Sequence, residues 1–119
     1  MKFKEHTYYF IGIGGIGMSS IARYLFLQGA SVFGYDKTRS AVTNSLEELG
    51  VTIVYDAAVT ALPAAVSSKE SLVVYTPAVS DEHPQLNFFI KQGNKVVKRA
   101  KLLGDLTRDT ICLAVAGTH

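Results

Sequence analysis

The stretch that decides the fold of this chain is TYYFIGIGGIG, residues 7–17. Its first half is apolar and rich in Tyr, Phe and Ile, which predicts a buried strand over residues 7–13. The glycines at 12, 14 and 17 match the pattern G-x-G-x-x-G between a strand and a helix. A turn without side chains lets the backbone approach a diphosphate, and the first amides of the helix then point at its oxygens. A tight turn that binds nothing is the alternative.

The rest of the chain continues the alternation of strand and helix. Apolar runs predict further strands at 31–35, 51–55, 72–76, 95–98 and 110–115, and helices with spaced apolar faces lie between most of them. Residues 56–70 are ambiguous, because the alanines favour a helix while Pro63 and two serines oppose it. Short strands joined by helices imply parallel crossovers. The fold class is therefore predicted as α/β, a Rossmann-like open parallel sheet of about five strands with helices on both faces.

Composition excludes several classes of protein. The 119 residues are 48% hydrophobic and carry a net charge of +2, too little for an electrostatic nucleic-acid binder. No apolar run reaches the ~18 residues of a membrane span, and the N-terminal run lacks the features of a signal peptide. A single cysteine, Cys112, excludes an intramolecular disulfide framework and fits a reducing compartment. We therefore expect a cytoplasmic protein with no nucleic-acid or membrane partner.

Isolated histidines and a local run of cations allow less specific interpretations. His6 and His83 lack metal-ligand spacing, so we expect solvent-exposed side chains and no metal site. Basic residues accumulate between 91 and 101 with no acid among them. This run is either a solvated edge or, at Arg99, a contact to an anionic ligand.

Two further features are typical of a nucleotide site. Asp36 lies at the end of the second predicted strand, 19 residues beyond Gly17, where an acid can accept hydrogen bonds from ribose hydroxyls. The loop of Thr76, Pro77, Ala78 and Val79 directly follows the fourth strand, and ligands of open parallel sheets bind at such carboxyl ends. These features indicate a nucleotide with a diphosphate without saying which one. On the glycine motif alone, an NAD(P)-binding domain of a dehydrogenase or regulatory sensor is the default alternative, and a fragment that binds nothing is a third.

Several motifs together resemble the MurC-type Mur ligases of peptidoglycan synthesis. The motifs, in the order of that family, are GIGGIGMS at 12–19, GYD at 34–36, TPAV at 76–79, Arg99-Ala100, and AVAGTH at 114–119. The resemblance covers the whole chain but only the first of the family's three domains. It implies a domain at 1–108 that binds the UDP part of UDP-N-acetylmuramic acid. Residues 109–119 would be the first strand and the start of the ATP loop of a central ligase domain.

The resemblance also implies which residues bind. The implied UDP-binding residues are Gly12, Gly14, Gly15, Ile16, Gly17, Met18, Ser19, Asp36, Thr76, Pro77, Ala78, Val79 and Arg99. Gly117, Thr118 and His119 would belong to an incomplete ATP loop. Lys101 departs from the family, which commonly has Glu or Gln at that position.

The implied activity is that of an ATP-dependent carbon–nitrogen ligase that adds L-alanine to the muramyl carboxylate. ATP and Mg²⁺ would be cofactors of the full-length enzyme only, because the loop lysine that neutralises a transferring phosphoryl group is absent from these residues. We therefore expect this chain to be inactive alone, with no catalytic residue and no bound cofactor, and to bind at most uridine nucleotides. A side chain at Gly14 is expected to block the diphosphate without unfolding the domain.

Overall fold

A computed structural model of the chain describes residues 6–109. Its strands are β1 (Thr7–Ile11), β2 (Ser31–Tyr35), β3 (Thr52–Val54), β4 (Leu72–Tyr75) and β5 (Lys95–Lys98). Its helices are α1 (Ile16–Leu27), α2 (Ala41–Leu49), α3 (Pro84–Gln92) and α4 (Arg99–Asp109), with two 3₁₀ turns, η2 (Val59–Ala61) and η3 (Ala64–Val66). The strands form one parallel sheet in the order β3-β2-β1-β4-β5.

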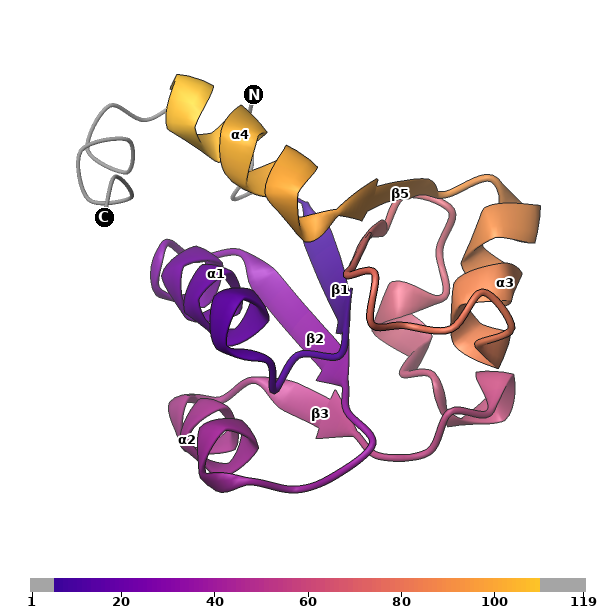
Figure 1. Cartoon of the computed structure of the whole chain (residues 1–119), viewed down its shortest axis with the longest axis horizontal. Helices are drawn as coiled ribbons and strands as arrows, with labels where there is room; N and C mark the ends of the chain where they lie inside the picture. Colours follow the sequence, from indigo (N-terminus) through magenta and orange to yellow (C-terminus); the bar gives the residue numbers. More distant parts are fainter. Residues whose placement is uncertain (1–5, 110–119) are drawn as a thin grey trace.

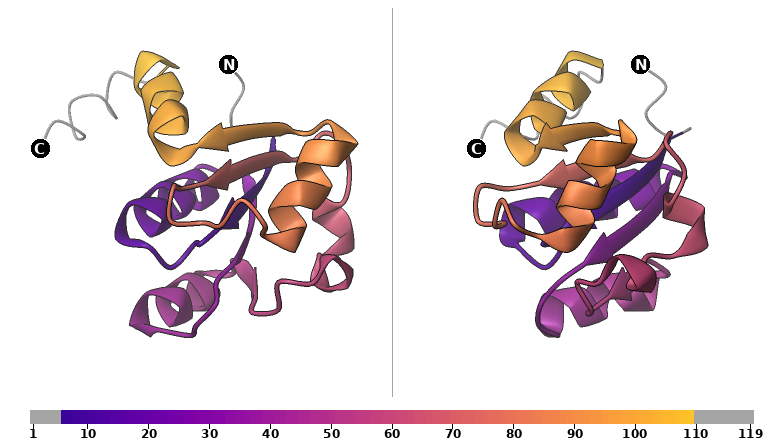
Figure 2. Two further views of the ribbon diagram at one scale, coloured as in Figure 1. Left: turned by 45° about the vertical axis from the view of Figure 1, so that its right-hand side comes forward. Right: turned by 90° about the vertical axis from the view of Figure 1, so that its right-hand side faces the viewer.

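The central strand β1 supplies side chains to two separate cores. Tyr8 and Phe10 pack on the face covered by α1, α2 and the start of α4, whereas Tyr9 and Ile11 pack on the face covered by α3 and η3. Figures 1 and 2 show the two groups of helices on opposite sides of the sheet. Because successive side chains of a strand point to opposite faces, a strand buried on both faces must be apolar throughout. The predicted fold class is confirmed.

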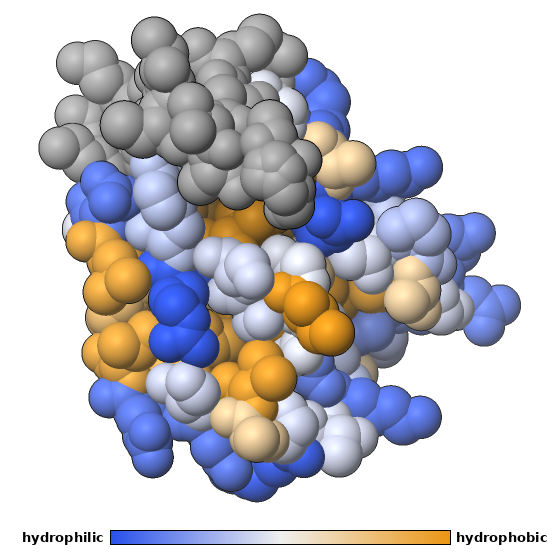
Figure 3. Space-filling view, turned by 60° about the vertical axis from the view of Figure 1, so that its left-hand side comes forward, coloured by the Kyte–Doolittle hydropathy of each residue, from blue (hydrophilic) through white to orange (hydrophobic). Residues whose placement is uncertain are grey.

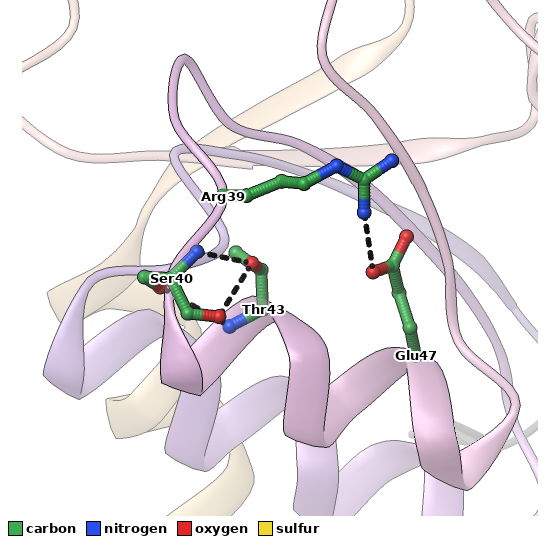
Figure 4. A network of polar contacts seen from close by, with 4 residues as sticks. All are labelled: Arg39, Ser40, Thr43 and Glu47. Carbon is green, nitrogen blue, oxygen red and sulfur yellow. Dashed lines mark hydrogen bonds and ion pairs between the residues drawn. The ribbon is translucent and has the colours of Figure 1, made fainter.

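Helix boundaries follow local chemistry. At α2, the Thr43 amide donates to Ser40 Oγ at 3.3 Å and the Ser40 amide donates to Thr43 Oγ1 at 2.8 Å, which is a reciprocal capping box (Figure 4). Arg39 precedes this box and pairs with Glu47 at 3.2 Å. Gly50 and Gly93 end α2 and α3 in the left-handed conformation, as their sequence positions predict.

The structure corrects the predicted end of the first strand and defines a segment that the sequence leaves ambiguous. The first strand ends at Ile11 rather than at residue 13, because Gly12 and Ile13 turn away and donate their amides to the Tyr35 carbonyl at 2.8 and 2.9 Å. The ambiguous residues 56–70 contain two 3₁₀ turns and no α-helix, since Pro63 separates the two turns. The predicted strand 110–115, with Cys112, and the residues Gly117, Thr118 and His119 lie outside the described residues.

The order of the strands in the sheet determines where a ligand can bind. The chain moves outward from β1 through β2 to β3 and then returns to the other side of β1 as β4. The carboxyl ends of β1 and β4 therefore diverge into connections on opposite faces, which leaves a crevice where open parallel sheets bind ligands. None of the helices in the described part combines the length and the apolar character that a bilayer crossing requires.

Candidate functional site

A cavity of about 580 Å³ lies at the carboxyl ends of β1, β2 and β4. Its lining residues come from the glycine turn, the end of β2, the loop after β4 and the start of α4. They are Ile11, Gly12, Gly15, Ile16, Gly17, Met18, Tyr35, Asp36, Lys37, Thr76, Ala78, Val79, Ser80, His83 and Arg99. The volume is within the range of small-molecule sites in proteins.

The glycine turn is bound to its neighbours at fixed points. Gly12 has a φ of +90°, which a residue with a side chain rarely adopts, and its carbonyl accepts from the Gly15 amide at 3.1 Å. The first helical hydrogen bond of α1 runs from the Ser19 amide to the Gly15 carbonyl at 2.8 Å. The amides of Ile16, Gly17 and Met18 therefore precede the helical hydrogen-bond ladder, and all three residues line the cavity.

Asp36 contacts the glycine turn from the end of β2. Its Oδ2 accepts from the Gly14 amide at 2.7 Å, and its Oδ1 accepts from the Thr38 amide at 3.1 Å. A β-carbon added at Gly14 would lie 2.7 Å from Asp36 Oδ2 and 3.0 Å from Thr43 Cγ2. A side chain at Gly14 would thus first collide with Asp36 and Thr43 rather than with a ligand, so the predicted block of the diphosphate without unfolding needs another position.

The loop after β4 forms the opposite wall. Thr76 begins a turn in which its carbonyl accepts from the Val79 amide at 3.0 Å and its Oγ1 accepts from the Ala78 amide at 3.3 Å. This turn directs Ala78 and Val79 toward the cavity that they line, while Pro77 is not among the lining residues.

His83 is not the solvent group that its isolation in the sequence predicts. Its Nδ1 accepts from the Leu86 amide at 3.4 Å at the start of α3, and its ring lies edge-on to Tyr35 with centroids 4.9 Å apart. Burial lowers the pKa of the imidazole, which favours the neutral ring that can accept at Nδ1. The signal in the sequence was its position just before Pro84, because proline favours the first position of a helix and the preceding residue is then the cap.

Most implied binding residues meet at the cavity, and three do not. Gly14 and Pro77 are outside the lining, and Ser19 is buried with its Oγ donating to the Ile16 carbonyl at 3.0 Å. Sequence reasoning missed Ile11, Tyr35, Lys37, Ser80 and His83. Tyr35 and Lys37 flank Asp36 and could have been found from that adjacency. Ser80 and His83 depend on how the loop after β4 folds back.

The described residues do not form a metal centre. Among the side chains that the structure describes, no group of three or more His, Cys, Asp or Glu is placed to hold a metal ion. The cavity instead has two cationic side chains, Lys37 and Arg99, beside the free amides of α1. This set of donors fits an anion carried by a larger molecule.

The chain is similar in sequence to curated ligases. The chain is 48% identical over 114 residues to the UDP-N-acetylmuramate–L-alanine ligase of Flavobacterium psychrophilum, covering 96% of this chain and 25% of that protein. It is 46% identical over 123 residues to the ligase of the same name from Christiangramia forsetii, covering 100% and 27%. The chain thus spans about a quarter of the length of these relatives.

Solved structures have the same fold. The crystal structure of UDP-N-acetylmuramate-alanine ligase from Thermotoga maritima superimposes with a TM-score of 0.76 at 28% identity, over 87% of this chain and 23% of that one. The model of the Mur ligase family, catalytic domain, matches residues 7–110. Because this match extends from the first strand to the end of the last described helix, the chain belongs to the Mur ligase family.

Proposed function

We propose that the cavity binds the UDP part of UDP-N-acetylmuramic acid. The observation that carries this proposal is the convergence of three first-turn amides and the cations Lys37 and Arg99 on one cavity at the carboxyl ends of the strands. Helix amides and a guanidinium are the donors that bind phosphate groups in proteins. The names of the curated relatives support the choice of nucleotide.

The two walls of the cavity bind different parts of the nucleotide. The glycine turn and Arg99 bind the diphosphate, while the ribose lies toward Asp36, whose carboxylate retains acceptor capacity beyond its bonds to Gly14 and Thr38. The base lies against the loop of Thr76, Ala78 and Val79. The muramyl lactate carboxylate then extends away from this domain.

For the whole protein we propose the addition of L-alanine to that carboxylate. ATP with Mg²⁺ supplies the phosphoryl group that activates the carboxylate when both are bound. The candidate ATP-loop residues Gly117, Thr118 and His119 lie outside the described residues, and the side chains that the structure describes offer no metal cluster. The contribution of the described domain is therefore to bind and orient the nucleotide sugar. The proposed location is the cytoplasm, where ATP and nucleotide sugars are available.

The alternative interpretation as an NAD(P)-binding domain is not supported. An NAD(P)-binding domain is the default interpretation of a glycine motif seen alone, but both curated relatives described above are ligases. A glycine turn of this kind fits a uridine nucleotide as well as a dinucleotide, because its amides recognise a diphosphate and not the group beyond it.

Thermal stability with added nucleotides tests the proposal. A ligand at 100 times its Kd adds ~2.7 kcal/mol, which raises the Tm of a domain of this size by several degrees. We expect UDP and UDP-N-acetylmuramic acid to raise the Tm of the 119-residue chain, with UMP weaker and NADH without effect. Stabilisation by NADH and none by UDP would refute the proposed function.

A further inference from the structure

Arg99 lies at the junction between the cavity and helix α4. It is the first residue of α4, follows β5 directly, and lines the cavity. A β-carbon added at Gly17 would lie 3.0 Å from Cδ, Nε and Nη1 of Arg99. The side chain of Arg99 therefore packs closely against the first turn of α1, and a side chain at residue 17 would force it to shift.

This contact brings the positive guanidinium of Arg99 close to the positive end of the α1 dipole. The N-terminus of α1 carries about half a positive charge from its aligned peptide dipoles, and the guanidinium adds a full one. Among the side chains that the structure describes, those of residues 6–104, no acidic group forms an ion pair with Arg99. An anion between the two elements would convert this repulsion into attraction on both sides.

The first turn of α4 rests on α1 through one other buried side chain. Leu102 is 1% exposed and belongs to the same core cluster as Met18 and Ile21 of α1. Residues three apart lie on the same face of a helix, so Arg99 and Leu102 both face α1. The neighbouring Lys101 is exposed. Leu103 is partly buried against the same cluster. Arg99, a cavity cation, is thus one of the side chains through which the start of α4 contacts α1.

We propose that Arg99 is a positioning residue that couples occupation of the cavity to the docking of helix α4. This inference rests on the proposed function, since the anion is the diphosphate of the bound nucleotide. An anion held by the amides of α1 also attracts Arg99, and Arg99 is part of α4. By linkage, the bound nucleotide stabilises docked α4 by the same factor by which docked α4 strengthens nucleotide binding.

Hydrogen exchange on the 119-residue chain, with and without saturating UDP, tests this coupling. We expect UDP to slow exchange of the amides in the glycine turn and, by about fivefold or more, of those at 100–104 in α4. For the Arg99→Gln variant, the concentration of UDP is raised until the amides of the glycine turn are as protected as in the wild type. Under these conditions we expect the amides of α4 to remain unprotected. Arg99→Lys, which keeps the charge, restores part of the protection.

Lys37→Gln is the matched control, because Lys37 is the other cation of the cavity and follows β2 rather than beginning α4. Its UDP affinity falls, but α4 is protected as in the wild type once the turn is occupied. Protection of the glycine turn without protection of α4 in the wild type, or equal protection of α4 in Arg99→Gln, would overturn the coupling alone. If UDP protects neither segment, the proposed function itself fails.

Discussion

At the scale of single residues, Gly14 and Gly15 are adjacent in the sequence but have different surroundings. A β-carbon at Gly14 meets Asp36 and Thr43 within 3.0 Å, whereas at Gly15 the nearest atom, the Gly12 carbonyl oxygen, is 3.5 Å away. Gly15 is also the N-cap of α1, with φ −65° and ψ 151° and no side-chain hydrogen bond. Serine is a better N-cap than most residues and adopts these angles without strain.

We therefore expect the same substitution to have opposite effects at the two positions. Gly14→Ser lowers the free energy of unfolding by about 1–3 kcal/mol through overpacking. Gly15→Ser leaves it unchanged or raises it slightly by capping α1. Urea denaturation of both variants measures this difference. Equal stability of the two variants would show that Asp36 and Thr43 do not confine residue 14.

Ile16 and Leu27 are exposed apolar side chains at opposite ends of α1, with exposed fractions of 85% and 63%. Figure 3 shows apolar residues separated by hydrophilic ones on a face of the molecule. Of these two side chains, Ile16 lines the cavity and Leu27 does not. A carboxylate at position 16 would repel the diphosphate at short range, where each 1.4 kcal/mol corresponds to a factor of ten.

Ile16→Glu is expected to weaken UDP binding by about tenfold or more while leaving the Tm within a degree or two. Leu27→Glu is the control at the other end of the helix, with unchanged affinity. Isothermal titration calorimetry with UDP gives both values. Similar affinities for the two variants would place the diphosphate away from the first turn of α1.

At the scale of elements, α3 depends on the protonation of its cap. His83 accepts the Leu86 amide at Nδ1, which only the neutral ring can do, and burial lowers the pKa of His83 from its ordinary value of 6.5. Between its lowered folded-state pKa and about pH 6.5, His83 therefore binds fewer protons in the folded state than in the unfolded state. Stability from this group is fully present above that pH and declines as pH falls through 6.5 toward the lower folded-state pKa.

His83→Asn isolates this contribution, because asparagine is a good N-cap without a titrating ring. We expect the wild type to lose more Tm than His83→Asn between pH 7.5 and pH 5.5. Calorimetry across this range provides the comparison. Parallel Tm profiles for the two proteins would contradict a role for neutral His83.

At the scale of the whole molecule, Gln85 joins segments that are far apart in the sequence. This fully buried side chain accepts from Tyr9 Oη at 2.7 Å and donates to the carbonyls of Asp56 and Ala58, both at 2.9 Å. It thereby connects β1, α3 and the segment after β3. Such a network is stabilising only while every member has a partner.

Gln85→Leu is expected to lower the free energy of unfolding by about 2–4 kcal/mol, because Tyr9 Oη and two carbonyls lose their partner. Gln28→Leu serves as the control, since Gln28 is exposed. Guanidinium denaturation measures both. A change below 0.5 kcal/mol in Gln85→Leu would mean that water replaces the lost bonds.

The succession of strands and helices along the chain, the glycine turn and the parallel character of the sheet could all be predicted from the sequence. Local patterns suffice there, because alternation of apolar strands with amphipathic helices allows few architectures. The places where α2 and α3 end could be predicted for the same reason, since Gly50 and Gly93 act on their own neighbours.

Only the tertiary structure decided which residues far apart in the sequence contact each other. The bond from Gly14 to Asp36 spans 22 residues and that from Tyr9 to Gln85 spans 76, and the contact of Arg99 with Gly17 joins the two ends of the domain. No periodicity in the chain encodes such pairs, because they depend on strand order and on how the connections fold over the carboxyl ends. By itself the sequence determined the glycine turn and the family, whereas folding in three dimensions decided that Ser80 and His83 share the cavity beside that turn, because their position depends on how the loop after β4 folds back.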